Sequence, residues 1–216
     1  MVQWIVGIDE AGRGPLAGPV TVAAVAAKRG SGLRVQGSGR LKDSKRLSSR
    51  QREILSCTIK SNEGFRWAVA SVGPKIIDKQ GITRALNRAV AAVLHKLFPN
   101  SYSSRRPNRN YQKRSRDPDL ASGLNSIILL DGSLYAPSQL RQCTVIKGDE
   151  QISLIAAASI IAKVHRDKLM ERHHQHFPQY GFDIHKGYGT RLHYRRLQEL
   201  GPCSIHRRSF LKSLQN

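Results

Sequence analysis

The chain has 216 residues, of which 39% are hydrophobic, enough for one domain with a real core. Its 36 Lys and Arg against 15 Asp and Glu give a formal net charge of +21, which indicates a polyanionic partner such as nucleic acid. No run is long and apolar enough to span a bilayer, no signal peptide is evident and no two of the three cysteines form a CxxC pair. We therefore expect a cytoplasmic protein that has no contact with membranes, no zinc knuckle and no disulfide framework.

An apolar strand near the N-terminus ends in two adjacent acids. Residues 5–8 have the character of a buried strand and lead directly into Asp9 and Glu10. Side chains alternate between the two faces of a regular strand. These carboxylates can therefore serve one site only if the strand bends or a bulge re-aims one of them.

A turn that contains Gly12, Arg13 and Gly14 follows this strand. Glycine lets the backbone come close to a ligand, and the fork of an arginine suits a phosphate. Acids that can hold metal ions beside a turn that can grip a phosphate are typical of metal-assisted phosphodiester chemistry. A strand followed by an ordinary tight turn is the alternative explanation.

The next elements follow from composition and periodicity. Residues 20–27 predict a second strand paired with the first, and residues 65–72 predict a third. Ser48 is the expected N-cap of a helix that ends near residue 60. The spacing of apolar residues over 75–98 predicts a long amphipathic helix with a boundary at Gly81.

The segment that follows this helix is strongly basic. Residues 100–116 contain six Lys or Arg and no acid, and we predict a flexible basic insertion over about 100–125. It could tether phosphates without sequence preference while Tyr102 and Tyr111 stack on bases. A solvated insertion without a specific role explains its composition equally well.

The second half of the sequence contains another predicted strand that ends in an acid. Residues 126–130 predict a buried strand that leads into Asp131, and residues 143–146 predict a short strand. A turn over residues 147–150 then leads into a helix predicted for 151–174, whose first half is apolar or small and therefore buried.

Asp167 lies on this helix, four residues after Lys163 and eight after Ser159, so the three share one helical face. An acid in this position could project into a cleft. An exposed ion pair with Lys163 is the alternative. Beyond the helix, residues 178–189 predict a loop that places Tyr188 between two glycines, and residues 190–200 predict a short amphipathic helix.

Several segments, in order along the chain, resemble type 2 ribonucleases H, specifically the bacterial ribonuclease HII family. They are residues 9–14 (DEAGRG), 43–45 (DSK), 131 with 132 (DG), 156–167 (AAASIIAKVHRD), 185–190 (HKGYGT) and 206–210 (HRRSF). Only the region around residues 100–125 departs visibly from the family.

The resemblance implies an α/β fold of the ribonuclease H-like type, a mixed central β-sheet flanked by helices with a helical C-terminal portion. It implies one domain over residues 1–216, with a catalytic core over about 1–175 and a substrate-binding portion over about 176–216. We expect the protein to act as a monomer.

The resemblance also implies an endoribonuclease that cleaves the RNA strand of RNA–DNA hybrids. It would cut on the 5′ side of single ribonucleotides in duplex DNA and leave 5′-phosphate and 3′-hydroxyl ends, an activity of ribonucleotide excision and DNA repair. The implied catalytic and metal-binding residues are Asp9, Glu10, Asp131 and Asp167. Such clustered acids repel one another unless cations lie among them, and two Mn²⁺ or Mg²⁺ ions would serve.

The same resemblance assigns residues to the substrate. Gly12, Arg13 and Gly14 would grip the backbone around the ribonucleotide, and Lys45 would lie near its phosphates. Tyr188 would lie against the sugar, where the 2′-hydroxyl distinguishes RNA from DNA. A non-catalytic basic RNA-binding protein is the competing hypothesis. It explains the charge, but it leaves the placement of four acids unexplained.

Overall fold

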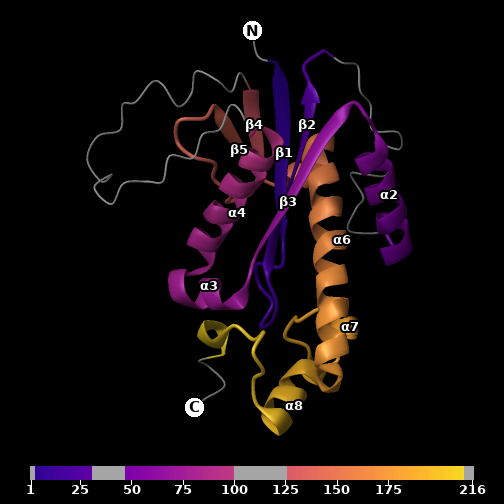
Figure 1. Cartoon of the computed structure of the whole chain (residues 1–216), viewed down its shortest axis with the longest axis vertical. Helices are drawn as coiled ribbons and strands as arrows, with labels where there is room; N and C mark the ends of the chain where they lie inside the picture. The colour runs from indigo at the N-terminus through magenta and orange to yellow at the C-terminus, as the bar shows by residue number, and fades with distance from the viewer. Residues whose placement is uncertain (1–2, 31–46, 100–125, 212–216) are drawn as a thin grey trace, which may run out of the picture.

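The computed structural model describes residues 3–30, 47–99 and 126–211, arranged around a sheet with the strand order β3-β2-β1-β4-β5 (Figure 1). The neighbours of the central strand β1 run antiparallel on the β2 side and parallel on the β4 side. The strands are β1 (Trp4–Ala11), β2 (Val20–Lys28), β3 (Phe65–Val72), β4 (Ser126–Asp131) and β5 (Gln142–Val145). The predicted mixed sheet is confirmed.

Helices cover both faces of this sheet (Figure 1). On one face α3 (Pro74–Gln80) leads into α4 (Ile82–Leu97), and on the other α2 (Ser49–Ser61) packs against the long helix α6 (Ser153–His176). The remaining short elements are α5 (Gly148–Gln151), η3 (Pro178–Tyr180), α7 (Phe182–His185), α8 (Arg191–Leu200) and η4 (Arg208–Phe210).

The apolar run of β2 is explained by burial on both faces. Val22 and Ala24 join the core against α4, whereas Ala23 and Val25 join the core against α6. A strand covered on both sides is apolar at every position, because neither set of alternating side chains meets water.

Most predicted elements are confirmed with small shifts at their ends. Ser48 caps α2, and it forms a reciprocal capping box with Gln51. Gly81, with φ 82°, separates α3 from α4. The predicted loop over residues 178–189 contains η3 and α7, and the predicted turn before α6 contains α5. These pieces are three or four residues long, too short to give a periodic apolar pattern.

Close packing of α6 on β1 sets the position of the candidate site. A Cβ added at Gly7 would lie 2.3 Å from the carbonyl carbon of Leu154, so only glycine permits this approach. Within the described part of the chain, no helix is long and apolar enough to cross a membrane. Lys45 and the predicted basic insertion lie outside the described residues.

Candidate active site

Asp9 and Glu10 occupy the end of β1, and the strand there is regular. Its pairing with β2 runs one to one through Ala11, which excludes the bulge considered from the sequence. The pairing of β1 with β4 ends at Ile8, so both acids lie beyond the last paired residue on that side. The two side chains can therefore lie near the end of β4 although they alternate between the faces of the sheet.

Asp9 is buried on the face that α6 covers, with 5% of its surface exposed. Burial raises the pKa of Asp9 well above its ordinary value, and the charge of Glu10 raises it further. A hydrogen bond with the side chain of Ser159 acts in the opposite direction, whereas the charge of Asp131 again raises the pKa. Oδ1 also accepts a hydrogen bond from the Glu10 backbone N–H at 2.7 Å.

Glu10 has one carboxylate oxygen near a cation and one without a partner. Burial raises the pKa of Glu10, the charge of Arg13 opposes this rise, and the charge of Asp131 adds to it. The Arg13 Nη1 atom lies 3.6 Å from Oε1. Oε2 is buried and has no hydrogen-bond partner among the described residues. An unpaired buried carboxylate oxygen is costly, and a bound cation would remove that cost.

Asp131 ends β4 and completes a set of three interacting acids. Its Oδ1 atom accepts a hydrogen bond from the backbone N–H of Gly148 at 2.6 Å. Its negative charge contributes to the raised pKa values of both Asp9 and Glu10. The structure thus brings together three of the four predicted acids.

Asp149 is an acid that the sequence analysis left within a turn. It is 4% exposed and follows Gly148, the residue that donates to Asp131. Lys147, the residue before Gly148, adopts a left-handed conformation with φ 53°, which is uncommon for a residue other than glycine. A signal was present in the sequence, because Asp149 closely follows a predicted strand, as Asp9 and Asp131 do.

The fourth predicted acid, Asp167, is engaged elsewhere. Its Oδ2 atom lies 3.3 Å from Nζ of Lys163, and 15% of its side chain is exposed. The ion pair weighed as an alternative from the sequence is therefore formed. The charge of Asp167, unlike that of Asp131, is not among the causes that raise the pKa values of Asp9 and Glu10.

The acids at the ends of β1 and β4 are the type of ligand that a hard divalent cation prefers, but they do not form a complete coordination site by themselves. Carboxylate oxygens are the ligands that Mg²⁺ and Mn²⁺ prefer, and the unpartnered oxygen of Glu10 provides one. Among residues 3–30, 47–99 and 126–211, no three His, Cys, Asp or Glu side chains converge closely enough to form a ready-made metal site.

The glycines of the predicted phosphate-binding turn have different environments. A Cβ added at Gly12, whose φ is 87°, would lie 1.9 Å from Nε of Arg166. Packing against Arg166 therefore requires glycine at this position, whether or not a ligand approaches it. At Gly14 an added Cβ would meet nothing within 4 Å. Packing against the described residues gives no reason for Gly14, so close approach of a ligand remains its explanation.

Arg13 and Tyr188 present exposed groups near these turns. The side chain of Arg13 is 44% exposed, and it contacts Glu10 and the hydroxyl of Ser133 just beyond β4. Tyr188 is also 44% exposed, and its ring lies 5.5 Å from the guanidinium carbon of Arg166. Both residues can therefore touch a ligand from the positions the sequence predicted.

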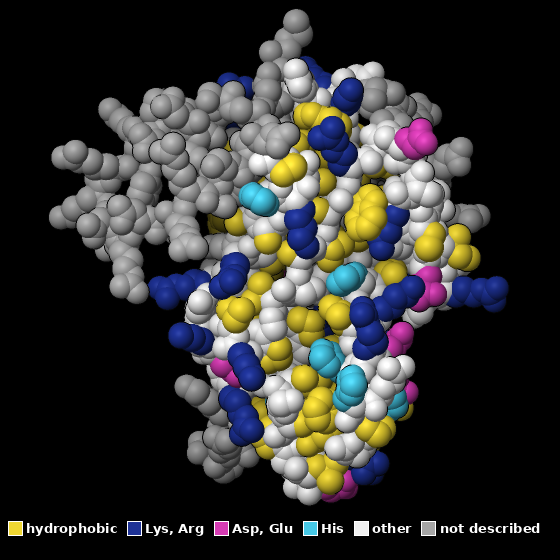
Figure 2. All heavy atoms as spheres, in the orientation of Figure 1, with side chains coloured by type: hydrophobic (Ala, Val, Ile, Leu, Met, Phe, Trp, Pro, Cys, Tyr) yellow, Lys and Arg dark blue, Asp and Glu magenta, His cyan; other side chains and the backbone are white. Residues whose placement is uncertain are grey.

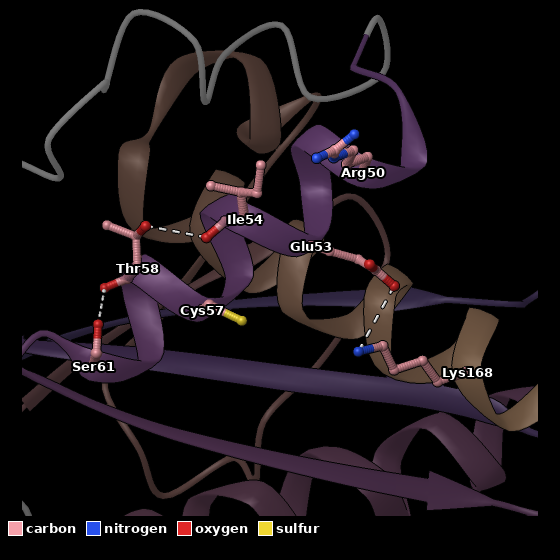
Figure 3. A pocket seen from close by; sticks show the side chains of 7 residues that line it. All are labelled: Arg50, Glu53, Ile54, Cys57, Thr58, Ser61 and Lys168. Carbon is pink, nitrogen blue, oxygen red and sulfur yellow. Dashed lines mark hydrogen bonds and ion pairs between the residues drawn. The ribbon is translucent and has the colours of Figure 1, made fainter.

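A separate open pocket of roughly 590 Å³ lies between α2 and α6 (Figure 3). An ion pair between Glu53 and Lys168 crosses its edge at 3.7 Å. None of its lining residues belongs to the predicted site; they are Arg50, Glu53, Ile54, Cys57, Thr58, Ser61 and Lys168.

Comparisons with known proteins show which family the chain belongs to. The family model Ribonuclease HII matches residues 6–106 and 131–213. A ribonuclease HII of Chlorobium phaeobacteroides is 41% identical over 216 residues, which cover 97% of this chain and 91% of that relative.

Solved structures show the same fold. The chain matches the structure of the PCNA:RNase HII complex from Archaeoglobus fulgidus with a TM-score of 0.71 and 28% identity, covering 98% of this chain and 97% of that one. Bst-RNase HIII in complex with Mn²⁺ gives a TM-score of 0.58 at 19% identity over 93% of this chain and 63% of that one, a likeness of fold alone. The chain therefore belongs to the ribonuclease HII family and is a ribonuclease H enzyme.

Proposed function

We propose that this ribonuclease H cleaves the RNA strand of RNA–DNA hybrids and also cuts on the 5′ side of single ribonucleotides in duplex DNA. Hydrolysis would leave 5′-phosphate and 3′-hydroxyl ends. The observation that carries the proposal is the placement of three acids at the ends of two neighbouring parallel strands, Asp9 and Glu10 on β1 and Asp131 on β4, in a protein of net charge +21. A protein that only bound RNA would gain nothing from three repelling acids.

Asp9, Glu10 and Asp131 would hold two divalent ions, Mg²⁺ or Mn²⁺. The free Oε2 atom of Glu10 and the raised pKa values of Asp9 and Glu10 support this role, because a cation would satisfy the oxygen and relieve the repulsion. Bound divalent ions supply an activated water and neutralise charge that develops on the leaving oxygen. The hydrogen bond from Gly148 to Asp131 orients one of the ligands before the metal binds.

Two acids are candidates for a fourth ligand. The family resemblance assigns Asp167, which forms an ion pair with Lys163. Asp149 is buried next to the backbone that bonds Asp131, and this position favours it. We therefore propose Asp149 as the fourth ligand and keep Asp167 as the alternative, which would have to leave Lys163 before it could bind a metal.

The substrate would lie across the exposed groups beside these acids. Arg13 would bind a phosphate, Gly12 and Gly14 would let the backbone approach it closely, and Tyr188 would read the 2′-hydroxyl. The exposure of Arg13 and Tyr188 and the open space at Gly14 support these roles. Lys45 and the C-terminal portion from about residue 176 would add further contacts.

The test is cleavage of two labelled duplexes, an RNA–DNA hybrid and a DNA duplex with one ribonucleotide, in Mg²⁺ or Mn²⁺. We expect both to be cut, with a single cut at the ribonucleotide and a 3′-hydroxyl that a polymerase can extend. Tight binding without cleavage under either metal would favour the basic RNA-binding protein. Cleavage of the hybrid alone would retain the enzyme and reject the single-ribonucleotide activity.

A further inference from the structure

Arg166 and Arg207 are buried cations that form no ion pair with a carboxylate among the residues that the structure describes. Only 1% and 0% of their surfaces are exposed. Burial lowers the pKa of both groups, and the charge of Arg166 lowers that of Arg207 further. Because a buried charge is costly unless it is compensated, other groups must stabilise this pair.

Backbone carbonyls surround Arg166 instead of acids. Nε donates to the carbonyl of Pro19 at 3.0 Å, and Nη2 donates to those of Lys186 at 2.9 Å and Ala17 at 3.3 Å. The same guanidinium carbon lies 5.5 Å from the centre of the Tyr188 ring. One side chain of α6 thus contacts both the turn after β1 and the turn that carries Tyr188.

Arg207 binds three further carbonyls of the turn after β1. Nε donates to the carbonyl of Gly18 at 2.9 Å, Nη1 to that of Arg13 at 2.9 Å and Nη2 to that of Gly12 at 2.6 Å. Because its three nitrogens are spread in a plane, one arginine can fix three carbonyls that lie along a curved backbone.

The two turns also bond to each other directly. The carbonyl of Gly187 accepts hydrogen bonds from the backbone N–H groups of Leu16 at 2.9 Å and Ala17 at 3.3 Å. A Cβ added at Gly187 would lie 2.5 Å from the carbonyl oxygen of Ala17. The turn over residues 12–19 and the turn over residues 186–188 therefore form one unit, with the arginines inside it.

We propose that Arg166 and Arg207 are positioning residues that fix the spacing between the backbone that grips the phosphate and the tyrosine that reads the ribose. The preference for a ribonucleotide over a deoxyribonucleotide then depends on two side chains that never touch the substrate. This inference rests on the proposed function. Lysine keeps the charge but cannot hold three carbonyls in the plane of a fork, so Arg166→Lys isolates the geometric role.

The measurement is a ratio of dissociation constants in the Asp9→Asn background, which prevents turnover. One duplex contains a single ribonucleotide and the other is all DNA of the same sequence. We expect Arg166→Lys and Arg207→Lys to lower the ribonucleotide preference by about tenfold, with binding of the DNA duplex changed by less than about twofold. A folded Arg166→Lys variant with an unchanged ratio would overturn the inference.

A double-mutant cycle with Tyr188→Ala separates positioning from general destabilisation. If Arg166 acts through the tyrosine, Arg166→Lys changes the preference only while Tyr188 is present. Additive effects of the two substitutions on the ratio would contradict the proposal. A loss of overall stability alone lowers the folded fraction for both duplexes equally, and it leaves the ratio unchanged.

If Arg166→Lys fails to fold, Gly12→Ala decides, because it displaces the guanidinium without removing it. The matched control is Gly18→Ala, which has a similar φ of 85° but directs its Cβ at Sδ of Met170, 2.2 Å away, and meets Arg166 only at an ordinary contact of 3.6 Å. We expect the preference to fall in Gly12→Ala more than in Gly18→Ala, and equal effects would overturn the inference. A wild type without any ribonucleotide preference would instead reject the ribose-reading part of the proposed function.

Discussion

Asp9 and Glu10 are held in an environment that disfavours their charged forms. Their folded pKa values lie above those of the unfolded chain, because of burial and of the other acids nearby. Folding therefore takes up protons at these groups, so their effect on stability is most favourable below the unfolded pKa values. Their contribution to stability becomes unfavourable as the pH rises through the pKa values that these groups have in the folded protein. At neutral pH the metal-free site is a local source of instability that cations would relieve.

Asp9→Asn should accordingly stabilise the metal-free protein at neutral pH, because it removes a buried charge that faces two others. In a chain of this length each kcal/mol corresponds to about 2–4 °C in Tm. We expect a higher Tm than the wild type in EDTA and a smaller gain on adding Mn²⁺. A variant that melts below the wild type in EDTA and responds fully to Mn²⁺ would show that Asp9 has a different role.

The identity of the fourth acid can be decided with two matched substitutions. We expect Asp149→Asn to reduce single-turnover cleavage by at least about 100-fold, since it removes a buried acid that directly follows Gly148, the backbone donor to Asp131. Asp167→Asn should stay within about tenfold of the wild type in cleavage and lose only about 1 kcal/mol of stability, because its ion-pair partner Lys163 is 40% exposed to solvent. The opposite ranking would favour Asp167, the residue assigned by family resemblance.

At the scale of residues, the acids are easier to predict from sequence than the groups that support them. Asp9 and Asp131 are recognisable because a buried strand ends at each. Asp149 was missed because an acid before a helix is also an ordinary start of that helix. The burial of Arg166 and Arg207 depends on contacts with residues more than 140 positions away, which no local pattern records.

At the scale of elements, the contact between β1 and α6 depends on a single glycine. Gly7→Ala would force its Cβ against backbone atoms of Leu154 that cannot rotate away. We expect a loss of about 1–3 kcal/mol or more in the free energy of unfolding, measured with urea. Gly14→Ala is the control, because its Cβ enters open space; it should keep the stability and weaken substrate binding. Equal stability of both variants would contradict this account of the packing.

A chain of neutral histidines supports the turn that carries Tyr188. Nδ1 of His206 accepts from the Cys203 N–H at 3.0 Å, so its Nε2 carries the proton and donates to Nε2 of His193 at 3.0 Å. Nδ1 of His193 then donates to the carbonyl of Tyr188 at 2.9 Å. Nδ1 of His185 accepts from the backbone N–H of residue 187 at 3.1 Å, so its Nε2 donates to the carbonyl of residue 180 at 2.8 Å.

Low pH should disrupt this series of hydrogen bonds between histidines. Burial lowers the pKa of His193 and His206 to about 4, below the ordinary value of 6.5. Their contribution to stability is therefore complete above about pH 6.5. It is lost as the pH falls toward 4, by about 1.4 kcal/mol per pH unit for each histidine. His193→Gln should make the loss shallower, whereas His176→Gln at an exposed position should not. Identical acid unfolding curves for all three proteins would refute this assignment.

Elements with a clear period or cap were predictable, and short ones were not. The boundary at Gly81 and the cap at Ser48 follow from single residues with strong local preferences. The helical turns α5 and α7 owe their form to contacts with the rest of the chain and left-handed residues at their ends, Lys147 and Lys186. Nothing in their composition distinguishes them from loops.

At the scale of the molecule, charge is distributed widely rather than confined to the site. Lys and Arg side chains are scattered over much of the described part of the face in Figure 2, whereas Asp and Glu lie mainly toward its margins. Such a surface attracts phosphates without reading the sugar. The acids of the candidate site must therefore provide the cleavage reaction, and Tyr188 must provide the preference for a ribonucleotide, because the surface charge can provide neither.

This division of roles predicts a particular response to salt. Between 50 and 200 mM salt, we expect affinity for both a ribonucleotide-containing duplex and its DNA counterpart to fall by at least about 10³-fold, because released counterions drive binding. The ratio of the two affinities should stay constant, since contacts with the sugar release no ions. A ratio that falls with salt would mean that charge itself provides the preference.

The order of strands was the part of the fold that local patterns could not provide. The central place of β1 and its parallel pairing with β4 join residues more than 120 positions apart, so periodicity predicts the strands but not their neighbours. The resemblance to type 2 ribonucleases H supplied the fold class, a mixed sheet flanked by helices, and the match to solved structures confirms that class. The strand order itself comes from the structure.

The most direct test of the proposed mechanism is single-turnover cleavage of a DNA duplex with one ribonucleotide in Mg²⁺, comparing the wild type with Asp9→Asn. We predict one cut on the 5′ side of the ribonucleotide in the wild type. In Asp9→Asn the rate should fall by at least about 10³-fold while the dissociation constant stays within about threefold. Cleavage by Asp9→Asn at the rate of the wild type would contradict the central claim that this acid holds the catalytic metal.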